Sequence, residues 1–238
     1  MSGTMASREY IALASQLGTI GSACLAQKGV VIEASQDRDL GPFMRRNPAT
    51  AGGVCKALSL YWIGMHAQEE SFWDWLGTQG AIKTLSAEAV MATFLSYGRH
   101  LDNFDRANPT SSNAEYDAQK DVWANNVLGK YKVVPYTSVT GKSVAKISGG
   151  LDVVTKVAFA VLNNTDVYMQ LSLGGTAGRH AVSLYSGFKD VNFYDPNYGE
   201  YWFPHKTALA TWLGNFMRIT GYSRALGADY TIRYYKKG

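Results

Sequence analysis

The sequence is poor in cysteine, histidine and charged residues. Its 238 residues contain two cysteines, Cys24 and Cys55, and four histidines, and only 18% of them are charged. Two cysteines in a chain of this length are no disulfide framework, which favours a reducing environment where the protein acts. The cysteines cannot form a metal-ligand cluster, and the histidines show no HExxH or similar spacing. We therefore expect neither a metal nor another cofactor.

Long hydrophobic runs and clusters of basic residues are also missing. No apolar stretch approaches the length of a membrane span, and the first residues lack the basic and apolar segments of a signal peptide. Lys and Arg exceed Asp and Glu by 23 to 19, and the basic residues are scattered along the chain. This mild excess does not make a nucleic-acid footprint, although it suits loose attraction to an acidic partner or a membrane surface.

Apolar and aromatic residues are plentiful, at 46% and 13% of the chain, which predicts a folded protein with a substantial core. Hydrophobic periodicity, caps and turn residues indicate mostly helices first and antiparallel strands second, an α+β arrangement without internal repeats. The predicted helices are 6–17 (interrupted by Gly18 and Gly21), 54–67, 70–76, 87–97, 114–128 and 205–218. The predicted strands are 29–33, 167–173, 180–185, 191–194, 201–203 and 230–235. Segments 35–51 and 102–113 are predicted to be irregular.

The stretch Gly52-Gly53-Val54-Cys55 introduces the residue on which the predicted chemistry depends. Two glycines allow a tight turn, and an apolar run with Leu58 and Trp62 on one face follows. Cys55 therefore falls at the first turn of a buried helix, whose positive end stabilises the reactive thiolate. A lone cysteine on an apolar helix is more often part of the core, so a nucleophile needs a base and an orienter elsewhere. Cys24 has no such neighbours, and we expect it to be structural.

His180 and Asp195 are the candidates for that base and orienter. His180 opens a predicted strand, and Asp195 lies where the next strand ends, before Pro196, which cannot continue the ladder. Adjacent antiparallel strands in the right register would bring the two side chains within hydrogen-bond reach. A carboxylate on one imidazole nitrogen fixes the tautomer and supports the imidazolium that forms when the histidine takes the thiol proton. Asp190 is a rival carboxylate, but its turn position favours a capping role.

Three blocks of the sequence carry a resemblance to a known family. They are 52–59 with Trp62, 179–182, and 193–201. In this order and with about these gaps, they resemble the YopT/AvrPphB family of papain-like cysteine-protease effectors. The resemblance implies Cys55 as nucleophile, His180 as general base and Asp195 as orienter.

The oxyanion-stabilising side chain is the one position that departs from the family pattern. Family members carry an Asn or Gln a few residues before the nucleophile, which donates to the oxyanion together with the cysteine's backbone N–H. The nearest candidates are Thr50, which has the better spacing, and Asn47, which has the better donor chemistry. Asn47 is preferred.

The predicted fold is α+β and papain-like, with a helical first part whose nucleophile helix packs on an antiparallel sheet from the second part. Residues 1–45 are predicted as an N-terminal extension, a helix plus an irregular segment, and residues 46–238 as the papain-like cysteine protease domain.

The predicted function is cleavage of a host protein through a Cys-His-Asp triad and a thioester intermediate. Deamidation of a Gln or Asn side chain in a host protein uses the same triad and is the first alternative. A non-catalytic binding module on this fold is the second. The resemblance implies secretion by a bacterium and action in the host cytoplasm. The expected partners are a host protein substrate, with a secretion chaperone and loose membrane-surface association as further candidates, and no nucleic acid.

Overall fold

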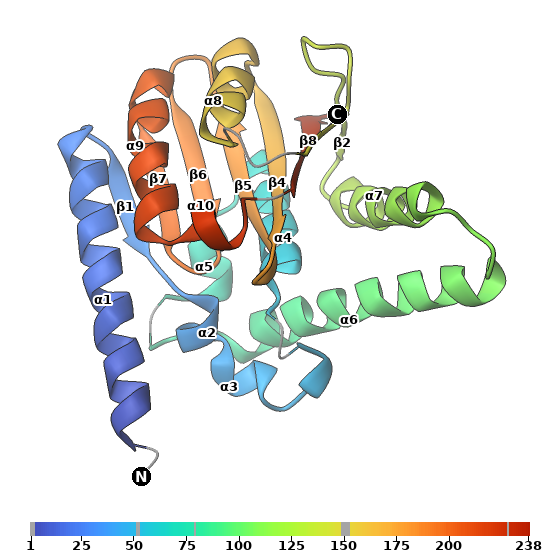
Figure 1. The fold of residues 1–238 in the computed structure, drawn as a ribbon, viewed down its shortest axis with the longest axis horizontal. Helices are drawn as coiled ribbons and strands as arrows, with labels where there is room; N and C mark the ends of the chain where they lie inside the picture. The colour runs from blue at the N-terminus through green and yellow to red at the C-terminus, as the bar shows by residue number, and fades with distance from the viewer. Residues whose placement is uncertain (1–2, 51–52, 79, 149–152, 228) are drawn as a thin grey trace.

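An eight-stranded sheet with helices against both faces organises the chain in the computed structural model (Figure 1). The structure describes residues 3–50, 53–78, 80–148, 153–227 and 229–238. The strand order is β1-β7-β6-β5-β4-β8-β2, with β3 also paired to β8, and all these pairs are antiparallel. The strands are β1 (Val30–Glu33), β2 (Val133–Pro135), β3 (Val144–Ser148), β4 (Val167–Gly175), β5 (Gly178–Ser186), β6 (Val191–Asp195), β7 (Gly199–Phe203) and β8 (Asp229–Lys237).

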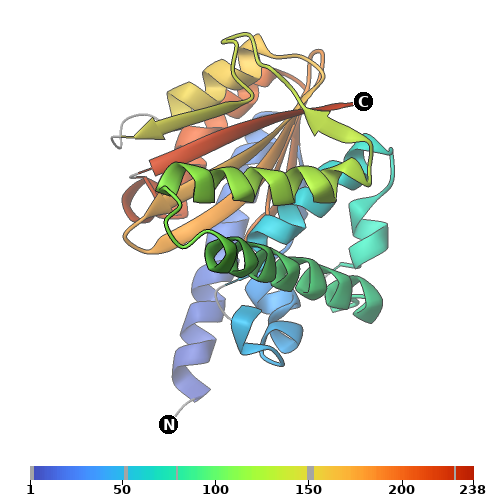
Figure 2. The ribbon, with the colours of Figure 1, turned by 90° about the vertical axis from the view of Figure 1, so that its right-hand side faces the viewer.

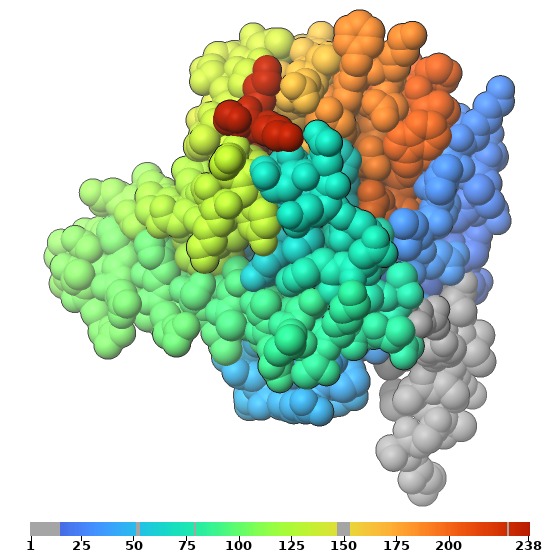
Figure 3. Space-filling model, turned by 180° about the vertical axis from the view of Figure 1, so that it is seen from behind, coloured from blue at the N-terminus to red at the C-terminus, as the bar shows by residue number. Residues whose placement is uncertain are grey.

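The helices form two layers, one on each side of this sheet. They are α1 (Gly3–Ala26), α2 (Gln36–Asp39), α3 (Gly41–Met44), η1 (Pro48–Thr50), α4 (Cys55–Ala67), α5 (Phe72–Leu76), α6 (Thr84–Ala107), α7 (Asn113–Gly129), α8 (Val153–Asn163), α9 (Lys206–Ile219) and α10 (Tyr222–Ala225). Helices α1, α8 and α9 pack on one face, and α4 to α7 contribute the layer on the other (Figure 1). Figure 2 shows α6 and α7 side by side. Figure 3 shows α6 and α7 extending to one side of the face that α4 to α7 cover.

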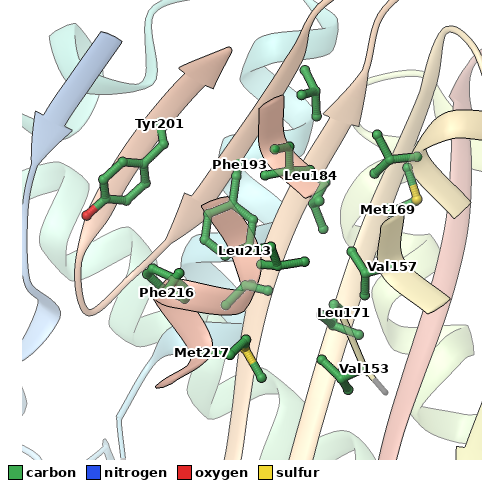
Figure 4. Close-up of a cluster of buried hydrophobic side chains, with 14 of the residues drawn as sticks. Val153, Val157, Met169, Leu171, Leu184, Phe193, Tyr201, Leu213, Phe216 and Met217 are labelled. Carbon is green, nitrogen blue, oxygen red and sulfur yellow. The ribbon is translucent and has the colours of Figure 1, made fainter. Parts of the chain in front are cut away.

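Strand alternation divides the buried side chains between two cores. Successive strand residues point to opposite faces, and in β6 Phe193 joins the core under α8 and α9 while Tyr194 joins the core under α4. Tyr234 and Tyr235 of β8 divide in the same way. We call the core under α8 and α9 the first core. Figure 4 shows side chains of this core, with Phe216 from α9 beside Phe193. The antiparallel sheet therefore has no solvent face in its centre, and it holds α4 rigidly.

Helix α4 is the buried helix predicted around Cys55, and it begins at that residue. Leu58 and Trp62 are each 1% exposed, as expected for its apolar face. Two reciprocal hydrogen bonds fix the helix to the sheet, from Ser59 Oγ to the Ala181 carbonyl (3.1 Å) and from Ser183 Oγ to the Ser59 carbonyl (3.0 Å). These bonds connect α4 directly to the strand that carries His180.

Several predicted element boundaries are wrong. Helix α1 continues to Ala26 through Gly18 and Gly21, because its buried residues Leu17, Ile20 and Cys24 pack in the first core and outweigh a glycine cost of about 1 kcal/mol each. The segment 35–51, predicted irregular, contains α2, α3 and η1. Helix α6 runs to Ala107, into the predicted loop. Helix α8, β2 and β3 were not predicted, since short valine-rich runs fit helix and strand equally well.

The predicted α+β class, with the Cys55 helix packed on an antiparallel sheet from the second part, is confirmed. The division at residue 45 stays a prediction; β1, from the predicted extension, pairs with β7 at one edge of the common sheet. Gly52 lies outside the described residues, while Gly53 has a φ of 98°, a left-handed conformation that suits glycine. Among the described helices, none is both long and apolar enough to cross a membrane.

Candidate active site

Cys55 lies at the N-terminus of α4, where the first backbone N–H groups have no partner within the helix and the helix dipole is positive. Its side chain is 9% exposed, so only a small part of it reaches the surface. It accepts a hydrogen bond from the backbone of Ala181 in β5 and makes a side-chain hydrogen bond with His180. The sequence predicted that Cys55 lies at the start of a helix, and the fold adds its hydrogen bond with Ala181 in β5.

His180 and Asp195 meet at the ends of neighbouring strands β5 and β6. His180 Nε2 lies 2.9 Å from Asp195 Oδ1, and both side chains are buried. The same oxygen accepts from the backbone N–H of Asn197 at 2.7 Å, which closes the turn after Asp195. Because Nε2 faces the carboxylate, Nδ1 is left for Cys55. The structure thus brings together all three residues of the predicted triad.

Tyr222, at the start of α10, supports the histidine from the side. Its ring packs against the His180 ring with centroids 5.2 Å apart, and its hydroxyl donates to Asp195 Oδ1 at 3.5 Å. It also accepts a hydrogen bond from the Asn197 side chain at 3.0 Å. The other carboxylate oxygen of Asp195, Oδ2, is buried without a hydrogen-bond partner among the described residues. A buried carboxylate with one oxygen left without a donor from the described part of the chain favours a positively charged His180 beside it.

The electrostatics of the pair favour a thiolate and an imidazolium. Burial raises the pKa of Cys55, but the charge of His180 and the hydrogen bonds from His180 and Ala181 outweigh it, so the pKa is lowered from its ordinary value. Burial lowers the pKa of His180. The charges of Asp195 and Cys55 raise it by a larger amount, so the pKa is raised to about 10. Each partner thus stabilises the charged form of the other.

Gln36, in α2, is a site residue that the sequence reasoning missed. Its side chain is buried and lies between Cys55 and the Asp195 turn. Gln36 Oε1 accepts from the Val54 backbone N–H at 2.9 Å, and Nε2 donates to Asn197 Oδ1 at 2.7 Å. Its backbone N–H donates to the Pro196 carbonyl at 2.7 Å. The second proton of the Nε2 amide is not engaged by these contacts and can serve an oxyanion beside Cys55.

Asn47 and Thr50, the predicted oxyanion candidates, are not among the described residues that line the hollows beside Cys55. Thr50 is fully buried, and its hydroxyl donates to the carbonyls of Met44 and Asn47, at 3.0 and 2.8 Å. Asn47 Oδ1 accepts from the Ala49 backbone N–H at 3.2 Å. The Thr50 hydroxyl and the Asn47 side-chain oxygen thus make short-range bonds to the backbone around η1. No signal in the local sequence around Cys55 points to Gln36, which reaches the site only through the tertiary fold.

A cleft passes over Cys55 and His180. Two hollows of about 340 Å³ each share Gly53, Cys55, Arg179 and His180 in their walls. One extends toward Gln36 and Tyr222, and the other toward α6, α7 and β8. The arrangement therefore presents the thiol to a chain that enters from either side.

Asp190, the rival carboxylate, lies outside this cleft. Its Oδ2 accepts a hydrogen bond from the Trp202 indole N–H at 2.9 Å, and its backbone carbonyl accepts from Gly187 in the turn. Within the described ranges, no group of three or more His, Cys, Asp or Glu side chains could hold a metal ion. The chemistry available at this site is that of a paired thiol and imidazole.

Comparison with known proteins places this geometry in a family. A family model described as Yersinia/Haemophilus virulence surface antigen, peptidase C58, matches residues 35–234. The chain belongs to this family. The match includes α2 with Gln36 and extends into β8, so it covers the whole cleft. The resemblance to the YopT/AvrPphB family is thereby confirmed.

Curated relatives in the family are named as cysteine proteases. The chain is 28% identical over 200 residues to the cysteine protease YopT of Yersinia pestis, a match that covers 77% of this chain and 56% of YopT. It is 25% identical over 184 residues to the protein adenylyltransferase and cysteine protease IbpA of Histophilus somni, covering 73% of this chain and 4% of IbpA. The chain thus matches about half the length of YopT and a small part of IbpA.

A solved relative confirms the fold. The crystal structure of the Pseudomonas avirulence protein AvrPphB superposes with a TM-score of 0.57, at 16% sequence identity, over 79% of this chain and 94% of that one. The mixed helical and antiparallel architecture of this chain is therefore shared with AvrPphB.

Proposed function

We propose that the protein is a cysteine protease effector, which a bacterium secretes and which cleaves a host protein in the host cytoplasm. The observation that carries the proposal is the hydrogen-bonded series from Asp195 through His180 to Cys55 at the start of a buried helix. The chain belongs to a family in which relatives are named as cysteine proteases, and this membership supports the same activity. The secretion and the host substrate in this proposal are taken from the resemblance of this chain to its family.

The first chemical step is acylation of Cys55. The thiolate attacks the carbonyl carbon of the scissile peptide bond, and a tetrahedral oxyanion forms. The backbone N–H of Cys55 and the Gln36 amide donate to that oxygen. His180 then gives its proton to the leaving amine, the C–N bond breaks, and a thioester remains on Cys55. Asp195 holds the imidazole in the required tautomer and stabilises its charged form.

The second step is hydrolysis of the thioester. With the amine gone, neutral His180 takes a proton from a water molecule, and the hydroxide attacks the thioester carbonyl. The same two donors stabilise the second oxyanion. Collapse of this intermediate releases the carboxyl product and restores the thiolate and the imidazolium. The pKa shifts of both groups keep this pair charged near neutral pH.

Mass spectrometry of host proteins tests this function directly. A host-cell lysate is incubated with the wild-type protein or with Cys55→Ala, and new peptide termini are sequenced. We expect termini that appear only with the wild-type protein. If the proteins stay intact and one gains about one dalton at a Gln or Asn, the enzyme is a deamidase that uses the same thioester route.

Alkylation separates an enzyme from a binding module without knowledge of the substrate. We expect iodoacetamide near pH 7 to label Cys55 much faster than Cys24, because the pKa of Cys55 is lowered whereas burial raises that of Cys24 to about 12. The labelled peptide identifies the residue. Equal, slow labelling of both cysteines in the folded protein would support the binding module instead.

A further inference from the structure

One of the two hollows beside Cys55 has a strongly cationic wall. It has a volume of about 340 Å³ and draws side chains from α4, α6, α7, β3, β4, β5 and β8. Its charged lining residues are Lys56, Lys120, Lys146, Arg179, Arg233 and a single acid, Asp117. This local excess contrasts with the whole chain, in which basic residues exceed acidic ones only by 23 to 19. Charge of one sign gathered in a cleft attracts ligands of the opposite sign.

The acids near this hollow are already committed. Asp117 bridges Lys120 at 2.7 Å and Lys146 at 3.0 Å. Arg233 is paired with Asp121 of α7 and also donates to Ser172 Oγ at 3.2 Å.

Lys56 and Arg179 remain without an acidic partner among the described residues. Lys56 follows Cys55 directly in α4, and its ammonium lies over the ring of Tyr97, 4.3 Å from the centroid. Arg179 precedes His180 in β5 and is exposed at the mouth of the cleft. An ammonium that faces aromatic rings and has no carboxylate of the described residues within ion-pair distance is poorly compensated, although the more distant charges of Asp121 and Cys55 act in its favour. Accordingly, burial and then the charge of Arg233 lower the pKa of Lys56 to about 7.

We propose that this hollow binds an anionic side chain of the substrate, within a few residues of the scissile bond. Shared walls at Gly53, Cys55 and His180 place the hollow next to the reacting thiol. An anion there pairs with Lys56 and Arg179 and stabilises the charged form of the lysine. Asp, Glu and phosphorylated residues all carry this chemistry. The proposal rests on the proposed function, because it assigns a substrate feature to the same cleft.

The binding test uses Cys55→Ala, which holds a peptide without cleaving it. Three matched pools of random hexapeptides carry Glu, Gln or phosphoserine at one fixed position, and binding is measured by fluorescence anisotropy. We expect the Glu or phosphoserine pool to bind at least about fivefold more tightly than the Gln pool, as for a favourable exposed ion pair. The tighter of the two anionic pools identifies the anion. Equal binding of all three pools would overturn the proposal.

Two lysine variants locate the binding in this hollow. Lys146 is more than half exposed at the rim, so Lys146→Glu should fold normally, and we expect it to abolish the preference for the anionic pools. A Lys pool should then bind more tightly to Lys146→Glu than to the parent. Lys156→Glu, on the exposed side of α8, makes the same charge change outside the hollow and should leave the preference intact. If both variants lose it equally, the attraction is general and the proposed site is wrong.

Cleavage by the wild-type protein separates this proposal from the proposed function. Peptides released from a digested proteome should show Asp, Glu or a phosphorylated residue enriched at one fixed distance from the cut. Cleavage without such enrichment leaves the protease function standing and overturns the anionic subsite. Anion-selective binding by Cys55→Ala without any cleavage by the wild-type protein leaves the subsite standing and overturns the protease function.

Discussion

Cys24 and Cys55 are both buried and both free of disulfide bonds, yet their surroundings differ in kind. Cys24 belongs to the core between α1, α9 and the sheet, and its thiol donates to the carbonyl oxygens of Val30 and Trp202, at 3.9 and 4.0 Å. Cys55 begins α4 on the other face, beside His180. Burial raises the pKa of Cys24 to about 12, whereas the charge and hydrogen bond of His180 lower the pKa of Cys55 although burial acts against them.

The difference indicates that a charged partner decides the direction in which the pKa of a buried cysteine shifts in this fold. Desolvation acts against the thiolate at both positions. At Cys55 the strand ends bring His180 and Asp195 into contact, while the wall around Cys24 offers only carbonyl oxygens, which repel a thiolate. Each variant below removes one part of that contrast.

Removal of the sulfur should have the largest effect. We expect Cys55→Ala to lower kcat/KM for a cleaved substrate on the order of 10⁶-fold, the scale seen when a triad nucleophile is lost. Cys24→Ala is the matched control and should keep nearly full activity. The measurement is initial rates on the substrate identified in lysate. Activity retained by Cys55→Ala would place the chemistry elsewhere.

Removal of the Asp195 charge should have the next largest effect. We expect Asp195→Asn to lower kcat by about 10²- to 10⁴-fold, since the imidazole loses its orienting charge. The charge of Asp195 raises the pKa of His180, so the imidazolium persists to about pH 10 in the wild-type protein. Without it, the alkaline limb of the kcat/KM profile should move to lower pH.

Asp190→Asn is the control for the Asp195 variant, because it makes the same change at the Trp202 contact outside the cleft. It should leave both the rate and the alkaline limb unchanged. A loss of rate in Asp195→Asn with no movement of that limb would indicate a structural role only.

Loss of the Gln36 amide should cost less. We expect Gln36→Ala to lower kcat by about 10²- to 10³-fold with a smaller change in KM, as for other oxyanion donors. Asn47→Ala, at the position favoured by the sequence, should stay close to wild type, because Asn47 is not among the described residues that line the two hollows beside Cys55. Circular dichroism checks that Gln36→Ala keeps its fold without the bonds to Val54 and Asn197. Equal losses in kcat for both variants would contradict the assignment.

The contrast between Gln36 and the triad also shows what the sequence could predict. Cys55, His180 and Asp195 stand at element boundaries with strong local signals: a double glycine before a helix, a strand start, and a strand end before proline. These local sequence patterns were therefore enough to predict where the three residues lie. Gln36 lies in a four-residue helix with no periodicity, and it reaches Cys55 because β1 joins the sheet and directs the chain back across the site. Such a long-range contact leaves no local pattern.

The errors in the fold have the same physical origin. The class and the central strands followed from alternation and turn residues, which are local. Helix α1 continued through two glycines because its buried face packs in the first core, and α8 formed from a valine-rich run because its apolar side meets that core. Tertiary packing overrides propensity at such places. The cationic hollow likewise collects its charged side chains from five elements, α4, α7, β3, β5 and β8, so no single segment of the sequence predicts it.

Loss of the Cys24 sulfur should affect only the stability of the protein, and this is the smallest of the predicted effects. We expect Cys24→Ala to lower the free energy of unfolding by about 1 kcal/mol, because a fully buried sulfur is removed and a small cavity remains. Urea denaturation measures this loss, while kcat/KM stays at the wild-type value. The site is tight, since an added methyl group at Gly29 would lie 2.5 Å from the Cys24 sulfur. Gly29→Ala should therefore destabilise the protein more than Cys24→Ala does. Combining the two should cost less than the sum of their separate effects, because loss of the sulfur relieves one of the two close contacts, while the contact of the methyl group with the Trp202 carbonyl oxygen at 2.6 Å remains.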